Sequence, residues 1–153
     1  MFTRQDLTKI KAIVQEFFEK MTIPVEIELK PLKEQTLAVN VEMEKPQVLI
    51  GEGGQTLLEA QRLLKIVLRR KIDKAFYLDL DINGYKKKKI EYLKQLARSV
   101  ADEVALNKKE KVLPSMPAYE RRIIHLELAG RENIATESIG REPERKVAIR
   151  PYP

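Results

Sequence analysis

Two residues separated by one helical turn, Arg121 and His125, form the most chemically suggestive pair in the sequence. A spacing of four residues places both side chains on one face of a helix. A guanidinium can clamp a phosphate with two hydrogen bonds or stack on a base, and an imidazole can hydrogen-bond or stack. Ala118 and Ala129 lie on the same face, so we expect both functional side chains to be exposed. The pair indicates a nucleic-acid contact, although a packed structural role for this single histidine is equally compatible with the pattern.

A second candidate is a glycine-rich loop between two apolar segments, with the sequence Gly51, Glu52, Gly53 and Gly54. Glycine allows the backbone to approach a polyanion closely, and free N–H groups at the start of the following helix favour phosphate. The carboxylate inside the loop opposes such binding. A nucleotide-binding P-loop requires a lysine followed by Ser or Thr after the last glycine, and Gln55 and Thr56 stand there instead. The loop therefore favours a backbone contact to nucleic acid over a nucleotide site.

The basic residues are unevenly distributed. Residues 1–84 carry 13 basic and 13 acidic side chains, whereas residues 85–153 carry 16 and 10. A one-sided basic field attracts polyanions, although net charge also provides solubility. Further phosphate contacts are expected in and around the second half, at Lys86, Lys87, Arg122 and Arg145, with Arg141 and Arg150 as additional candidates.

Several function classes are disfavoured by what the sequence lacks. Without cysteine there is no disulfide, no thiolate nucleophile and no cysteine-ligated metal, which fits a reducing compartment. No apolar run resembles a signal peptide or a membrane span. Glu120 and Glu127 do not share the helical azimuth of His125, and no serine motif exists, so general acid–base or nucleophilic catalysis is not expected. We expect a cytoplasmic protein without cofactor, metal or membrane insertion, and not an enzyme.

Hydrophobic periodicity predicts an α+β first half. A helix is expected over Asp6–Met21, followed by a hairpin over Val25–Leu29 and Leu37–Val41 and a short helical turn over 47–50. A longer helix is expected from Gln55 to Lys71, burying Leu57, Leu58, Leu64, Val67 and Leu68. A strand over Phe76–Ile82 closes this half, and the first domain is predicted to span residues 1–84.

The second half is predicted to be a second α+β domain spanning residues 85–153. It opens with a helix over Tyr85–Asn107, whose apolar positions include Ile90, Leu93, Ala97 and Val104. A short strand over 111–113, a helix reaching Leu128, and two strands over Ile134–Ile139 and Lys146–Ile149 follow. No linker separates the halves, so the two small domains are expected to abut directly.

The order of these elements and motifs resembles a known bacterial family. A glycine loop between two helices, after a hairpin, resembles a KH domain of the bacterial (type II) topology. The Arg121 and His125 pair, placed after Pro114-Ser115-Met116-Pro117 and before Thr136–Gly140, resembles the Arg-x-x-x-His (R-three-H) domain. Together, residues 22–153 resemble the bacterial Jag family, whose members are also called SpoIIIJ-associated protein, KhpB or EloR.

This resemblance implies binding of single-stranded RNA, with single-stranded DNA as a further ligand. It also implies a role in post-transcriptional or cell-envelope and elongation regulation. The alternative is a protein-interaction adaptor that pairs with another KH protein, which the carboxylate of Glu52 would suit. The predicted nucleic-acid-binding residues are Gly51, Glu52, Gly53, Gly54, Lys86, Lys87, Arg121, Arg122, His125 and Arg145.

Overall fold

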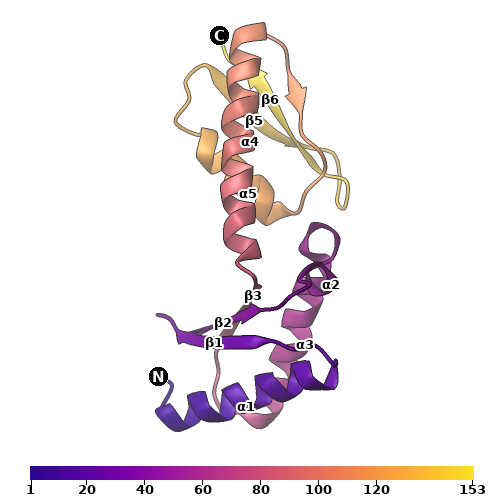
Figure 1. The fold of residues 1–153 in the computed structure, drawn as a ribbon. Coiled ribbons are helices and arrows are strands. Elements are labelled where there is room, and N and C mark those ends of the chain that lie inside the picture. Colours follow the sequence, from indigo (N-terminus) through magenta and orange to yellow (C-terminus); the bar gives the residue numbers. More distant parts are fainter. The chain divides into compact units, whose positions relative to one another are not determined.

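The computed structural model describes all residues from Met1 to Pro153. The chain divides into two compact units, residues 1–86 and 87–153, and Figure 1 labels most of their elements. Each unit combines helices with one three-stranded sheet, which confirms the predicted α+β class. The assignment of a separate binding domain to each side of Gly84 stays a prediction.

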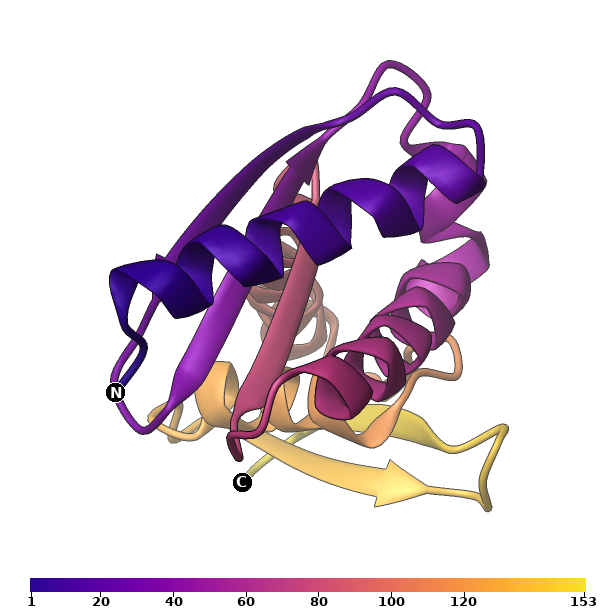
Figure 2. The same ribbon diagram turned by 90° about the horizontal axis from the view of Figure 1, so that it is seen from below.

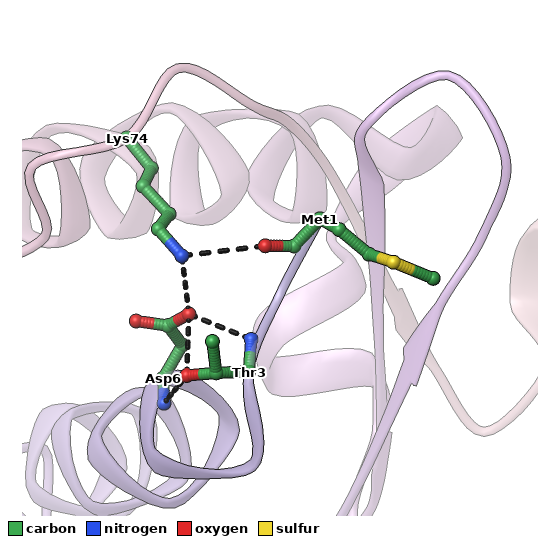
Figure 3. A network of polar contacts seen from close by, with 4 residues as sticks. All are labelled: Met1, Thr3, Asp6 and Lys74. Atoms are coloured by element: carbon green, nitrogen blue, oxygen red, sulfur yellow. Dashed lines mark hydrogen bonds and ion pairs between the residues drawn. The ribbon is translucent and has the colours of Figure 1, made fainter.

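The first helix, α1 (Arg4–Lys20), begins at a capping box. The Thr3 hydroxyl accepts a hydrogen bond from the Asp6 amide at 3.1 Å, and the Asp6 carboxylate accepts one from the Thr3 amide at 2.7 Å. Figure 3 shows the Lys74 ammonium donating to this carboxylate and to the Met1 carbonyl. These hydrogen bonds, above all the one from Lys74, lower the pKa of the Asp6 carboxyl. They tie the beginning of the chain to the segment that precedes the last strand of this unit.

The sheet of the first unit contains β1 (Glu26–Pro31), β2 (Thr36–Glu42) and β3 (Tyr77–Ile82), in that spatial order. The first two strands are antiparallel, whereas β2 and β3 are parallel. A parallel pair requires a crossover connection, here made by α2 (Gln47–Ile50), the 3₁₀ turn η1 (Glu52–Gly54) and α3 (Gln55–Lys71). This order and pairing give the type II KH-like fold.

Helices α1 and α3 cover one face of this sheet (Figure 2). In α3, Leu57, Leu64 and Leu68 are buried, as predicted. Val67 is only partly buried, and the prediction for Leu58 is wrong because its side chain is 41% exposed. At 100° per residue, Leu58 turns away from the line through the three buried leucines. The prediction treated every leucine of this helix as buried, and the buried stripe is narrower than that.

The second unit contains all but the first two residues of α4 (Tyr85–Asn107), together with β4 (Lys111–Val112), α5 (Ala118–Leu128), β5 (Ile134–Ile139) and β6 (Lys146–Pro151). Its strands are antiparallel in the order β4-β6-β5. The core combines one stripe of α4 with inward-facing residues of α5, β5 and β6. Ile90, another apolar residue of α4, is exposed. No helix in the chain is both long enough and apolar enough to cross a membrane.

Candidate nucleic-acid interface

Helix α5 places the Arg121 guanidinium inside the second unit. The Nη1 group donates to the Met116 carbonyl at 2.8 Å, and Nη2 donates to Glu142 Oε1 at 2.7 Å. The Arg121 side chain is only 8% exposed, whereas that of Glu142 is 56% exposed. The expectation that Arg121 lies on an exposed face is therefore wrong. Its guanidinium is a buried charge held in one orientation.

The helical azimuth of α5 explains this correction. Ile124 and Leu128 form the buried stripe of the helix, and Arg121 lies beside them. Ala118 and Ala129 are exposed, on the far side of His125 from that stripe. The face proposed from sequence thus straddles the boundary between core and surface. Arg121 lies inside this boundary and His125 lies on it.

The His125 ring is held between two hydroxyl groups of strand β5. Its Nδ1 lies 2.8 Å from Thr136 Oγ1, and its Nε2 lies 2.8 Å from Ser138 Oγ. Residues two apart on a strand face the same side, so both hydroxyls point to one ring. Burial, and secondarily the charge of Arg121, lower the pKa of His125. A neutral ring donates from one nitrogen and accepts at the other, and these hydroxyls satisfy both, so a ligand reaches either nitrogen only by displacing one.

The turn between β5 and β6 contacts the Arg121 guanidinium through Glu142. The Met116 amide donates to the Arg145 carbonyl at 3.2 Å, while the Met116 carbonyl accepts from Arg121. The backbone of Met116 therefore joins Arg121 to the turn that carries Glu142 and Arg145. The Arg145 Nε group is buried without a hydrogen-bond partner. A buried N–H without an acceptor is unfavourable, so an acceptor that reached this nitrogen would gain a full hydrogen bond.

The other predicted cations differ in how they are engaged. Arg122 and Lys87 are exposed and make no ion pair. Lys86 donates to Asp79 at 2.6 Å and to Gln61 at 2.7 Å. Its ammonium is committed within the first unit, which makes it a weaker phosphate candidate than Lys87.

Acidic side chains also compensate basic residues at the start of α4 and on β6. The Asp81 carboxylate accepts the Lys86 amide at 3.1 Å, which offsets the unfavourable cluster of lysines at the start of α4. Arg150, a sequence candidate for phosphate, forms ion pairs with Glu110 and Glu137 instead. Its charge is already neutralised on the sheet.

The glycine loop of the first unit has a conformation that requires glycine at two positions. Gly51 has φ of 71°, and a Cβ there would lie 2.1 Å from Thr56 Oγ1. Gly54 has φ of 81°, and a Cβ there would lie 2.9 Å from the Tyr85 ring. These glycines are needed by the local fold whether or not the loop binds a ligand. Gly53 also has a positive φ, of 61°, although a Cβ there would meet no atom within 4 Å.

Glu52 is exposed in this loop and has no ion-pair partner. Its uncompensated carboxylate lies just before α3, a helix whose N-terminus has no side-chain cap. The free amides of such a terminus attract anions, whereas the carboxylate repels them. The loop combines both effects. The nucleic-acid-binding role predicted for its four residues therefore stays a prediction.

A KH-like unit followed by a unit that holds an arginine and a histidine one turn apart defines a class of bacterial binding proteins. Residues 91–151 match the R-three-H domain family, which is a binding family rather than an enzyme family. The chain is also similar to proteins named "RNA-binding protein KhpB". It is 33% identical to the Clostridium symbiosum protein over 149 residues, covering 95% of this chain and 67% of that protein. The chain belongs to the KhpB family, which confirms the resemblance to Jag proteins.

Two further relatives carry the same name. The Bacillus subtilis protein is 37% identical over 116 residues, covering 74% of this chain and 56% of that protein. The Lactiplantibacillus plantarum protein is 34% identical over 111 residues, covering 72% of this chain and 34% of that protein. The chain thus spans between about a third and two thirds of the length of these relatives.

Sequence reasoning missed the residues that hold the Arg and His pair in place. Thr136 and Ser138 carried a usable signal, because two polar residues alternate on the inward face of a predicted strand. Glu142 and the Met116 carbonyl carried none. Their roles depend on how a turn folds back onto a helix, and a local pattern does not encode that contact.

Proposed function

We propose that this chain binds single-stranded RNA through its second unit and acts as a bacterial RNA-binding regulator of the Jag type, with single-stranded DNA as a further ligand. The observation that carries the proposal is the environment of Arg121 within the R-three-H segment. A buried, pre-oriented guanidinium has a solvent-exposed carboxylate as its only ion-pair partner. Such a group is suited to a phosphate, because Arg binds phosphate through its rigid fork of N–H donors. The name of the relatives, "RNA-binding protein KhpB", supports RNA as the ligand.

The surrounding side chains have distinct roles in this proposal. His125 orients the site and offers its ring for stacking, since both nitrogens are bonded to hydroxyls. Lys87 and Arg122 supply exposed charge for additional phosphates, and Arg145 supplies an unused donor. These contacts address the backbone and the stacking faces of bases, so they favour single strands over a specific sequence.

No catalytic role is part of this proposal. His125 has no carboxylate among its hydrogen-bond partners. A general acid or base must reach a substrate proton with one nitrogen, and neither nitrogen is free. We place the protein in the cytoplasm, where its ligand RNA is found and where a chain without cysteine loses no disulfide stabilisation.

The glycine loop is proposed as a separate, weaker phosphate contact of the first unit, formed by Gly51, Glu52, Gly53 and Gly54. Replacing Gly53 and Gly54 with aspartate would not test it cleanly, since a side chain at Gly54 meets the Tyr85 ring. Charge reversal at exposed Glu52 leaves the glycine backbone intact and is the better probe.

The experiment is a fluorescence anisotropy titration of the purified chain with a labelled single-stranded RNA of about 12 nucleotides, a length that lies within the range of known single-strand-binding sites. Duplex RNA and single-stranded DNA of the same sequence serve as comparisons. We expect single strands to bind more tightly than the duplex. The log of the affinity should fall with the log of the salt concentration, with a slope of about −0.7 per phosphate contacted. An absence of binding, or an affinity independent of salt, would overturn the proposal.

A second candidate function, the adaptor that pairs with another KH protein, is favoured by the outer face of α3. Leu58, Leu63 and Ile66 are exposed large apolar side chains on this helix. Exposed apolar patches often mark protein contacts. The variant L63E/I66E separates the two functions. The adaptor hypothesis expects loss of a co-purifying small KH protein with RNA affinity unchanged, whereas retention of that partner would reject it.

A further inference from the structure

The two partners of the ion pair between Arg121 and Glu142 differ greatly in solvent exposure, which indicates that the carboxylate can be replaced by another anion. The guanidinium is almost completely enclosed, at 8% exposure, and is anchored at its other end to the Met116 carbonyl. The carboxylate belongs to a surface turn and is 56% exposed. The arginine is therefore held in place by the fold, whereas the glutamate can rotate into solvent without disturbing a buried neighbour.

Such a rotation leaves the guanidinium without a counter-charge, which another anion has to supply. A buried guanidinium without a counter-charge is strongly unfavourable, so the carboxylate leaves only when another anionic oxygen replaces it. A nucleic-acid phosphodiester supplies that charge together with additional acceptor oxygens. It is also connected to neighbouring phosphates, which the exposed cations Arg122 and Arg141 can contact.

The same turn also contains a buried hydrogen-bond donor that has no acceptor. The Nε group of Arg145 is buried and has no acceptor, and the Arg145 carbonyl accepts from the same Met116 residue that accepts from Arg121. The turn that carries Glu142 therefore also carries an unused donor, on a residue whose carbonyl is bonded to Met116. Movement of this turn to release the carboxylate would expose that donor to the incoming ligand.

We propose that the Glu142 carboxylate occupies the position of a nucleic-acid phosphate on Arg121, and that single-stranded RNA binds by displacing it. Glu142 is then an internal competitor that sets the affinity and selectivity of the site. Ligands with weak or isolated charge fail to displace it, whereas a polyanion succeeds through its additional contacts. This inference rests on the proposed RNA-binding function.

The test compares E142Q with the matched control E144Q. Both variants remove one negative charge from the same turn, and Glu144 is exposed and has no side-chain partner. Glutamine keeps an acceptor oxygen for Arg121, so the guanidinium remains hydrogen-bonded although its counter-charge is lost. Circular dichroism of both variants checks that the unit remains folded. We expect E142Q to bind the labelled single-stranded RNA about fivefold more tightly than the wild type, because a charge-assisted bond no longer has to be broken. E144Q is expected to change affinity less than about twofold, through the general field alone.

A second readout uses inorganic phosphate as the probe in place of RNA. At equal ionic strength, replacing chloride with phosphate should raise the melting temperature of E142Q more than that of the wild type or E144Q. This readout tests the displacement of Glu142 separately from the RNA-binding function, because it does not depend on RNA binding. If the wild type fails to bind RNA, the proposed function fails. If RNA binds but E142Q is no tighter than E144Q, or is weaker, the displacement of Glu142 is refuted and the carboxylate instead orients Arg121.

Discussion

Replacing Arg121 with alanine should destabilise the second unit strongly, because the side chain is part of the core. The substitution leaves the Met116 carbonyl buried without its donor, which costs about 1–3 kcal/mol. Loss of the ion pair with Glu142 adds less than about 1 kcal/mol, since that partner is half exposed. Removal of the enclosed aliphatic stem adds about 1 kcal/mol. The total is about 2–5 kcal/mol.

A loss of this size is easily measured. For a unit of 60 to 100 residues it corresponds to a fall in melting temperature on the order of 10 to 40 °C. Circular dichroism with urea denaturation provides the free energy of unfolding at constant temperature. Binding of single-stranded RNA, measured well below the transition, should also weaken, because the buried clamp is gone.

The neighbouring residue provides the control. Arg122 is exposed and has no ion-pair partner, so R122A should change the free energy of unfolding by less than about 0.5 kcal/mol. The conservative variant R121K keeps the charge but loses the planar fork, and its stability should lie between those of the wild type and R121A. An R121A protein as stable as R122A would refute the burial argument. A destabilised R121A that still binds RNA normally would make the residue purely architectural.

Two further predictions follow from the same geometry. Because burial lowers the pKa of His125 below its ordinary 6.5, the unfolded state takes up the proton first as pH falls, so stability is complete above pH 6.5 and declines below it. The stability advantage of the wild type over H125Q, from urea denaturation, should therefore shrink between about pH 7.5 and 5.5; an advantage independent of pH would contradict this. Charge reversal in the glycine loop, E52K, should raise RNA affinity about threefold if the loop contacts phosphate. The control E28K, on the edge strand β1, should have a smaller effect, and equal effects of both would leave only general attraction.

Much of the fold was determined by local sequence. The helices over Gln55–Lys71 and Tyr85–Asn107 and the strand over Ile134–Ile139 have the predicted bounds. Their apolar residues recur with the period of the element, so the sequence alone defines both the type and the length. The family was equally readable, because the glycine loop and the Arg-x-x-x-His spacing occur in a fixed order along the chain.

Other features were decided only by tertiary structure. The sequence places Arg121 and His125 on one helical face but does not show where the boundary of the core crosses that face. Leu58 was misassigned for the same reason. A helical pattern reports relative angle, whereas burial depends on which other element packs against the helix. The partner of Arg121 lies 21 residues away on a turn, and the hydroxyls that fix His125 come from β5. These contacts form only after the strands pair and pack against α5, so a local sequence pattern does not predict them.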